Sequence, residues 1–221
     1  KYNEPMYKFI KEKDIASFLT LFQVITPIKN GTLGVENLNI SLQKLINKTN
    51  LQGIQKKVYE YKPADKVMHI KNENMKAQTM KLYKEGSHEF LEKRVFNGQL
   101  GIIIKVDHTK SKLVILYPND DMVVFYDFET LDHLVSLAYC LTIHKTQGME
   151  YDTALIPMTF SHFIMHNTKL LYTAITRAKN MCYIVGEDEA MTTACKKLEI
   201  TNRQTVIDDL LSYKEKVTLN I

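Results

Sequence analysis

The sequence predicts an α/β fold built on a parallel sheet and interrupted by a small inserted β-barrel. Helical and strand-like apolar runs alternate near both ends of the chain, as they do in parallel α/β domains. The middle of the chain instead carries short β-type runs separated by turn residues, a pattern typical of small barrels. With 221 residues, of which 45% are hydrophobic, the chain is long enough to bury the core of such a fold.

Residues 1–64 are expected to form the first part of the α/β domain. Apolar residues recur at helical spacing over 4–19, and a strand-like run follows over 21–26 until a proline ends it. Residues 29–34 make a glycine-bearing turn, for which a plain loop is the simpler interpretation. A polar, lysine-rich connector covers 47–63. The helix between turn and connector is expected to direct these apolar residues inward: Leu38, Leu42, Leu45 and Ile46.

Residues 65–131 are expected to form the barrel. Its strands are predicted from four runs rich in β-branched and aromatic residues, at 65–70, 101–106, 113–117 and 122–126. Between the first two runs lies a long polar excursion over 71–92, of a composition that can be disordered. Its lysines are candidate phosphate contacts, and a solvated loop is an equally good interpretation: Lys71, Lys76, Lys81 and Lys84.

Residues 132–221 are expected to return to the α/β domain. The apolar run 137–141 predicts a buried strand. Residues 167–179 predict a helix, and 181–185 predict the next buried strand. The helix has an apolar stripe at helical spacing: Leu170, Leu171, Ala174, Ile175 and Ala178. Two packing helices complete the prediction, over 188–198 and from a capping box at 201–204.

Two polar signatures mark a candidate site. The glycine-bearing segment 142–150 directly follows a buried strand, where open α/β sheets place ligands because the strand ends and the following amides face a crevice. In the predicted helix, Lys169, Thr173 and Arg177 lie four residues apart and share a face. The chain uses lysine almost everywhere, so this arginine hints at a need for a planar cation with several donors.

These segments resemble a known family. The strings LTIHKTQGMEYD (141–152) and LYTAITRAK (171–179) resemble motifs V and VI of superfamily 1 helicases in the RecD-like branch, the exodeoxyribonuclease V alpha subunit type, in that family's order and spacing. Residues 23–43 resemble the region around motif IV. The strings DKVM (65–68) and VFNGQLG (95–101) resemble the Src-homology-type barrel that RecD-like helicases insert into their second motor domain. The resemblance thus implies a RecA-like motor domain carrying that barrel.

The resemblance also implies roles for individual residues. Arg177 would be the arginine finger that stabilises charge on the transferred phosphoryl group. Gly148 would let the backbone approach a phosphate closely, and Glu150 would accept hydrogen bonds from a ribose hydroxyl. Lys29 would lie near the nucleotide or the domain cleft. Three residues would contact a nucleic-acid strand: Thr142, His144 and Lys145. Lys145 and the nearby Gln147 could instead serve the nucleotide.

Without these strings, simpler interpretations stay open. Arg177 would be a surface helix arginine, His144 a turn histidine, and Lys179 a solvent-facing cation at a helix end. The rival function is a non-catalytic module that binds single-stranded nucleic acid through the barrel. A nuclease has little support, because no acidic cluster has metal-binding spacing. His162 and His166 are four apart without a third ligand nearby in the sequence, so we expect no metal site.

Two helicase signatures are missing from the sequence. No glycine is followed by lysine, as a phosphate-binding loop requires, and no Asp-Glu pair follows a strand where the magnesium-holding motif should be. We therefore expect ATP and Mg²⁺ to be held mainly by an absent first motor domain. We also expect the chain, which begins at Lys1, to be an excised carboxyl-terminal part of a helicase and to be inactive alone. The resemblance implies 5′ to 3′ movement on single-stranded DNA, and the subunits of a recombination complex are candidate partners.

Composition adds mild constraints. The net charge of +4 fits a polyanionic partner without demanding one. We expect the three cysteines to be reduced core residues: Cys140, Cys182 and Cys195. No apolar run reaches the length of a membrane span and no signal peptide opens the chain, so a cytoplasmic location is expected.

Overall fold

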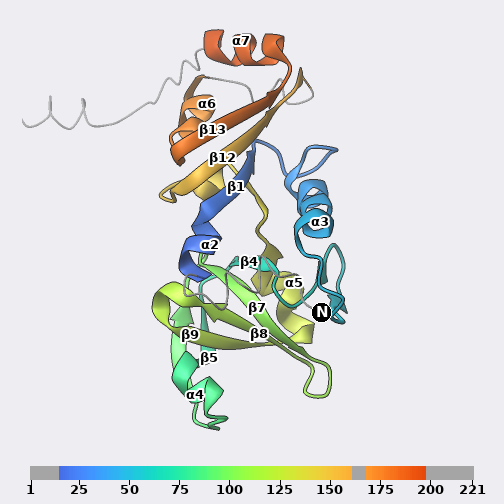
Figure 1. Ribbon diagram of the computed structural model, residues 1–221, viewed down its shortest axis with the longest axis vertical. Helices are drawn as coiled ribbons and strands as arrows, with labels where there is room; N and C mark the ends of the chain where they lie inside the picture. The colour runs from blue at the N-terminus through green and yellow to red at the C-terminus, as the bar shows by residue number, and fades with distance from the viewer. Residues whose placement is uncertain (1–14, 161–167, 198–221) are drawn as a thin grey trace, which may run out of the picture.

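The computed structural model describes residues 15–160 and 168–197, which form two large sheets, a two-stranded hairpin and the helices around them (Figure 1). One sheet is parallel, in the order β11-β1-β12-β13. The other has seven strands in the order β10-β4-β7-β8-β9-β5-β6, with antiparallel pairings. The predicted fold class, a parallel α/β sheet with an antiparallel insert, is therefore confirmed.

The parallel sheet consists of β1 (Phe22–Thr26), β11 (Cys140–Thr142), β12 (Tyr151–Met158) and β13 (Ala178–Gly186). Four helices lie around it: α2 (Ile15–Leu21), α3 (Val35–Ile46), α6 (Thr168–Ile175) and α7 (Asp188–Lys196). Its pairings fix two edges. The last residues of β1 and β11, Thr26 and Thr142, are partners at the carboxyl edge. The first residues of β12 and β13, Tyr151 and Ala178, are partners at the amino edge.

The seven-stranded sheet contains β4 (Lys66–His69), β5 (Glu73–Thr79), β6 (Leu91–Val95), β7 (Leu100–Asp107), β8 (Lys112–Tyr117), β9 (Met122–Asp127) and β10 (Val135–Leu137). We call residues 65–137 the inserted module. Two short helices belong to it, α4 (Met80–Lys84) and α5 (Leu131–Leu134), and a small hairpin of β2 (Ile54–Gln55) and β3 (Glu60–Tyr61) precedes it. The four predicted strand runs correspond to β4, β7, β8 and β9, so that part of the prediction is confirmed.

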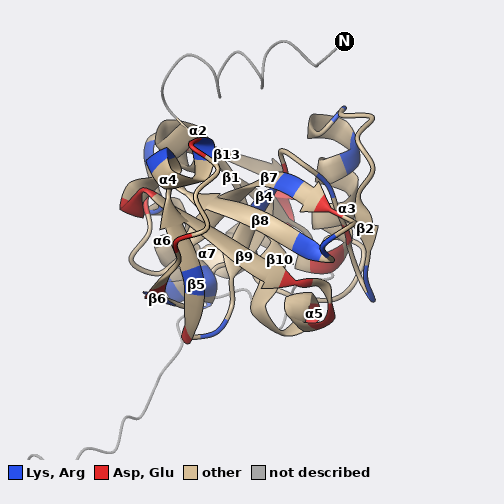
Figure 2. Ribbon diagram, turned by 90° about the horizontal axis from the view of Figure 1, so that it is seen from below, with Lys and Arg blue, Asp and Glu red and all other residues tan. Residues whose placement is uncertain are grey.

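The polar excursion over 71–92 is more ordered than its composition suggested. It forms β5, α4 and the start of β6, and the Thr79 side chain caps α4 by accepting a hydrogen bond from Leu82 N at 3.3 Å. The four lysines are exposed, and Lys71 pairs with Glu73 at 2.8 Å. Basic and acidic residues are interspersed over the inserted module rather than gathered on one basic face (Figure 2). A dedicated phosphate surface here is therefore not favoured.

The apolar run 137–141 is not one strand. Leu137 ends β10 in the antiparallel sheet, where it pairs with Val67, and Cys140 begins β11 in the parallel sheet. Between them the chain crosses from one sheet to the other, held by a hydrogen bond from Ala138 N to Lys66 O at 2.9 Å. Both halves of the run are buried, so its hydrophobicity alone predicted one continuous strand.

Three further expectations were wrong in detail. Leu45 of α3 is 67% exposed, because the most buried residues of this helix are Val35 and the polar Asn39 and Gln43. The predicted helix over 167–179 ends at Ile175, so Arg177 lies in the following turn and Lys179 lies in β13. β13 is an edge strand, and its outward side chains are exposed: Met181, Tyr183 and Val185.

Some expectations fall outside the described residues. These are the first part of the helix over 4–19, the pair His162 and His166, the first residue of the helix over 167–179, and the final helix that follows 201–204. The predicted helix after Gly186 is present as α7.

Buried polar residues join the two sheets. The Asp65 carboxylate accepts hydrogen bonds from the side chains of Gln43 and Asn47 on the α3 side and from the Tyr139 hydroxyl on the crossing segment. Burial raises the pKa of Asp65 to about 6, although these donors oppose the rise. Beside it, the buried Lys66 ammonium donates to Gln23 Oε1 at 2.8 Å, and its burial lowers its pKa to about 7.

Candidate active site

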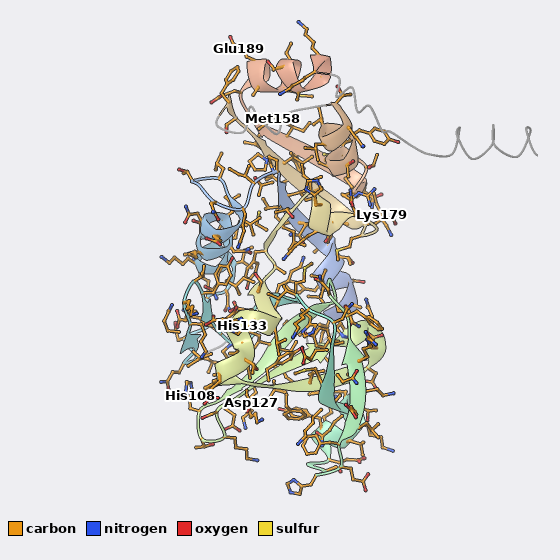
Figure 3. All side chains as sticks on the ribbon, turned by 180° about the vertical axis from the view of Figure 1, so that it is seen from behind. His108, Asp127, His133, Met158, Lys179 and Glu189 are labelled. Atoms are coloured by element: carbon orange, nitrogen blue, oxygen red, sulfur yellow. The ribbon has the colours of Figure 1, made fainter. Side chains whose placement is uncertain are left out.

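The predicted site residues fall into two groups at opposite edges of the parallel sheet. Because β11 and β12 are parallel, residues 143–150 run from the carboxyl edge at Thr142 to the amino edge at Tyr151. The carboxyl-edge group consists of Lys29, Thr142, His144 and Lys145. The amino-edge group consists of Gly148, Glu150, Arg177 and Lys179. Figure 3 labels one residue toward each edge of the sheet, Met158 at the end of β12 and Lys179 near the start of β13.

The carboxyl-edge group presents positive charge on exposed side chains. Thr142 Oγ1 accepts a hydrogen bond from Lys145 N at 3.3 Å, which shapes the turn carrying the exposed His144. Partial desolvation and the charge of Lys29 lower the pKa of Lys145, although much of its side chain remains exposed. Lys29 and Lys145 therefore lie close enough for their charges to repel each other. Two ammonium groups held near each other attract a polyanion such as a phosphate backbone.

Lys29 therefore differs from its expected grouping. It was expected with Gly148 and Glu150, but it follows β1 at the carboxyl edge and acts electrostatically on Lys145. Its own ion pair, with Glu36 of α3 at 3.5 Å, leaves its side chain 74% exposed. Strand register decides this placement, and register cannot be read from the motif strings.

Arg177 is the centre of the amino-edge group. Its Nη1 donates to Met149 O at 3.0 Å, its Nε to Thr173 O at 3.0 Å, and its Nη2 to Thr176 Oγ1 at 3.2 Å. Its own carbonyl accepts a hydrogen bond from Tyr151 N at 2.8 Å. The side chain is half-buried and held in one orientation, and its terminal nitrogens carry further N–H groups beyond these bonds.

Gly148 and Glu150 flank the carbonyl that holds this arginine. Gly148 has a φ of +80°, and a Cβ placed on it would meet no atom within 4 Å. Glycine is thus favoured here by backbone conformation, and the space beside it is open. Glu150 is exposed and forms an ion pair with Lys179 at 3.0 Å. Lys179, for which the sequence indicated no partner, is therefore paired with Glu150.

Three residues near the site were missed by the sequence analysis. The side chain of Met149 and the ring of Tyr151 lie between the amino-edge group and the inserted module, and the Lys66 ammonium lies 5.4 Å from the Tyr151 ring centroid. A cleft of about 220 Å³ opens between Met149–Tyr151 and Gly98–Leu100 of the module. The adjacency of Met149 and Tyr151 to Glu150 was the available signal. Nothing in the sequence marked Lys66.

The described residues contain no group of three or more His, Cys, Asp or Glu side chains that could hold a metal ion. The cysteines are free: Cys140 is buried, which raises the pKa of its thiol, but Cys195 is exposed and so is not the core residue that was expected. Among the described helices, none is both long and apolar enough to cross a membrane.

Comparisons with known proteins identify the family. The model described as "UvrD-like helicase C-terminal domain" matches residues 137–185, which include most of both groups. The model described as "ATP-dependent RecD-like DNA helicase SH3 domain" matches residues 38–117, which include most of the inserted module. The chain is a region of a RecD-like superfamily 1 DNA helicase.

Individual relatives agree with this family. This helicase region is 31% identical over 191 residues to the ATP-dependent RecD2 DNA helicase of Deinococcus radiodurans, covering 86% of the chain and 24% of that protein. It is 33% identical over 107 residues to the RecBCD enzyme subunit RecD of Mycobacterium tuberculosis, covering 46% of the chain and 17% of that protein. The helicase region thus spans less than a quarter of the length of these relatives.

Solved structures agree with the fold. A Pif1 helicase from Bacteroides, crystallised in complex with ADP-AlF3 and ssDNA, superposes with a TM-score of 0.52 at 16% identity. The match covers 96% of this helicase region and 49% of that chain. A structure of two coordinating Pif1 helicases at forked dsDNA gives a TM-score of 0.50 at 16% identity, covering 98% and 49%. Identity at this level speaks for the fold alone.

Proposed function

We propose that this region is the second motor domain of an ATP-dependent 5′ to 3′ DNA helicase, acting in the cytoplasm in DNA repair or recombination. We assign residues 65–137 to the inserted module rather than the expected 65–131, since β10 pairs with β4, and the segments before and after it to the motor domain, with the return to the parallel sheet at Cys140. The Deinococcus relative carries the printed name of an ATP-dependent DNA helicase, which supports this reading. The motor function needs two ligand surfaces, and the two edge groups supply them.

The observation that carries the proposal is the fixed position of Arg177. A guanidinium held by Met149 O, Thr173 O and Thr176 Oγ1 beside an open glycine loop is preorganised to direct its remaining N–H groups outward. Preorganised donors stabilise a phosphoryl transition state because they need no reorientation as its charge develops. Arg177 acts as the arginine finger, Gly148 admits a phosphate close to the backbone, and Glu150 accepts from the ribose.

The carboxyl-edge group takes the nucleic-acid role. Thr142, His144 and Lys145 contact phosphates of single-stranded DNA, and Lys29 joins them because it follows β1 at the same edge and its charge acts on Lys145. Such contacts position the strand without reading its sequence. The Bacteroides Pif1 helicase was crystallised with ssDNA, which supports single-stranded DNA as the ligand class.

The donor set of the amino-edge group suits phosphates better than a metal. Its charged side chains are Glu150, Arg177 and Lys179, and the carboxylate is already paired with an ammonium. When bound, Mg²⁺ would neutralise phosphate charge. We propose that ATP and Mg²⁺ are held mainly by the first motor domain, and that this region alone hydrolyses no ATP. The remaining partners are that domain and, by the family name of the RecD relatives, subunits of a recombination complex.

The test is Arg177→Ala in the full-length protein. We expect DNA-stimulated ATP hydrolysis to fall by about a thousandfold or more, as for other arginine fingers, while affinity for single-stranded DNA stays within about twofold. Arg94→Ala is the matched control, because Arg94 lies on β6 of the inserted module, outside both edge groups. If Arg177→Ala hydrolyses ATP at the rate of the control, the motor proposal is wrong and the alternative function, a non-catalytic nucleic-acid-binding module, is favoured.

A further inference from the structure

Met149 lies between the inserted module and the arginine of the amino-edge group. Its side chain packs against the cluster of Met68, Ala138 and Leu141, and so does Leu100; Met68 and Leu100 belong to β4 and β7 of the module. It also lies against the turn before β7, where a Cβ added to Gly98 would come within 3.3 Å of Met149 Cε. The module thus forms one wall of the pocket that holds this side chain.

The backbone of Met149 holds the arginine. Its carbonyl accepts the hydrogen bond from Arg177 Nη1 at 3.0 Å, and its N–H donates to Thr146 O at 3.0 Å. Its Sδ accepts a hydrogen bond from the Tyr151 hydroxyl at 3.1 Å. The side chain and carbonyl of one residue therefore face the module and the guanidinium, respectively.

A second contact joins the same segment to the module. The Lys66 ammonium of β4 lies 5.4 Å from the Tyr151 ring centroid, and Tyr151 N donates to Arg177 O at 2.8 Å. Tyr151 is fully buried, so its ring cannot shift without disturbing its neighbours. Movement of β4 or β7 relative to the parallel sheet would therefore reach Met149 and Tyr151, the residues on either side of Glu150.

We propose that Met149 is a positioning residue through which the inserted module sets the placement of the Arg177 guanidinium. The inference rests on the proposed function of Arg177 and extends it by naming what controls that arginine. When the module holds the Met149 side chain, the carbonyl keeps Nη1 in its place. When the module shifts, the carbonyl moves and the guanidinium leaves its orientation. ATP hydrolysis is thereby linked to the position of the module.

The experiment compares three methionine variants of the full-length protein in DNA-stimulated ATP hydrolysis. Met149→Ala removes the contact with the module, Met149→Leu keeps an apolar side chain of similar size, and Met191→Ala is the matched control. Met191 of α7 is also partly buried, but it packs against the cluster that contains Met158, the last residue of β12, away from the amino edge. Misplacing a group by about an ångström can lower a rate a hundredfold, so we expect Met149→Ala to lower kcat roughly tenfold or more with little change in KM. Met149→Leu should restore kcat to near the unmodified value, and Met191→Ala should leave it unchanged.

The double variant with Arg177→Ala separates positioning from general damage. If Met149 acts through the arginine, adding Met149→Ala to Arg177→Ala lowers kcat no further. A further multiplicative loss, or a Met149→Ala variant that matches Met191→Ala, overturns the positioning role while leaving the function of Arg177 in place. If Arg177→Ala alone leaves kcat unchanged, the proposed function fails and the positioning role fails with it.

Discussion

Replacing Asn39 with alanine tests how the edge strand that leads into the site is held. Asn39 is fully buried on α3, its Nδ2 donates to Cys140 O at 3.0 Å, and its Oδ1 accepts from Cys140 N at 2.9 Å. β11 is an edge strand of the described sheet, and this amide supplies the hydrogen bonds that a neighbouring strand would give. Alanine would leave a buried N–H and a buried C=O without partners.

The magnitude follows from those two groups. Each buried unsatisfied backbone group costs about 1–3 kcal/mol, so Asn39→Ala is expected to lower the free energy of unfolding by about 2–6 kcal/mol. Asn37→Ala is the matched control on the same helix, because Asn37 is exposed and makes one hydrogen bond, to Gly31 O at 2.9 Å. We expect it to cost less than about 1 kcal/mol.

The assay is urea unfolding of the chain, followed by circular dichroism, with the midpoint and slope fitted for both variants. Asn39→Ala should unfold at a clearly lower midpoint than Asn37→Ala with a similar slope. If the two variants unfold at the same urea midpoint, the Asn39 amide does not stabilise β11, and residues 143–150 are not anchored through it.

Three further predictions concern the carboxyl-edge lysines, the buried Lys66 and the isolated chain. In the full-length protein, Lys29→Ala combined with Lys145→Ala should reduce the slope of log affinity for single-stranded DNA against log salt by about 1.4, as expected for two lost phosphate contacts; an unchanged slope would remove these lysines from the nucleic-acid surface. The pKa of Lys66 is lowered to about 7, so the unfolded chain binds more protons than the folded one above pH 7. The free energy of unfolding of the wild type relative to Lys66→Met should therefore rise between pH 7 and pH 10, by on the order of 4 kcal/mol. A stability difference that does not change with pH would show that the pKa of Lys66 is not lowered. The isolated chain should show no ATP hydrolysis above background in a phosphate-release assay, and measurable turnover would show that the nucleotide is not held mainly elsewhere.

Local patterns in the sequence were enough to predict much of the fold. Short runs rich in β-branched and aromatic residues predicted β7, β8 and β9, and helical spacing predicted α3. The patterns failed where burial did not distinguish two structures. The run 137–141 is equally apolar on both sides of the crossing between sheets, and β13 has the composition of a buried strand although its outer face is exposed.

The site was predictable in its residues but not in its geometry. The two motif strings contain every residue of the amino-edge group, and the hydrogen bond from Arg177 to Met149 O joins the two strings in space. The strings could not show that residues 143–150 cross the sheet, because that depends on the register of β1 with both β11 and β12. For the same reason Lys29 was expected with the nucleotide group.

The polar joint between the sheets lay beyond sequence reasoning for another physical reason. A lysine in a strand is usually expected to face solvent, and Lys66 is buried only because Gln23 Oε1 and Phe22 O lie within reach of its ammonium. Those acceptors come from a strand more than forty residues earlier in the chain. Such long-range compensation leaves no local pattern.

The central claim is that the two edges of the parallel sheet serve two ligands. The most direct measurement determines kcat for ATP hydrolysis and affinity for single-stranded DNA on the same two full-length variants, Arg177→Ala and the double variant Lys29→Ala with Lys145→Ala. The account predicts a crossed pattern, in which the first variant loses hydrolysis at near-normal DNA affinity and the second loses DNA affinity but keeps kcat at saturating DNA. Variants that lose both properties together, in equal measure, would contradict it.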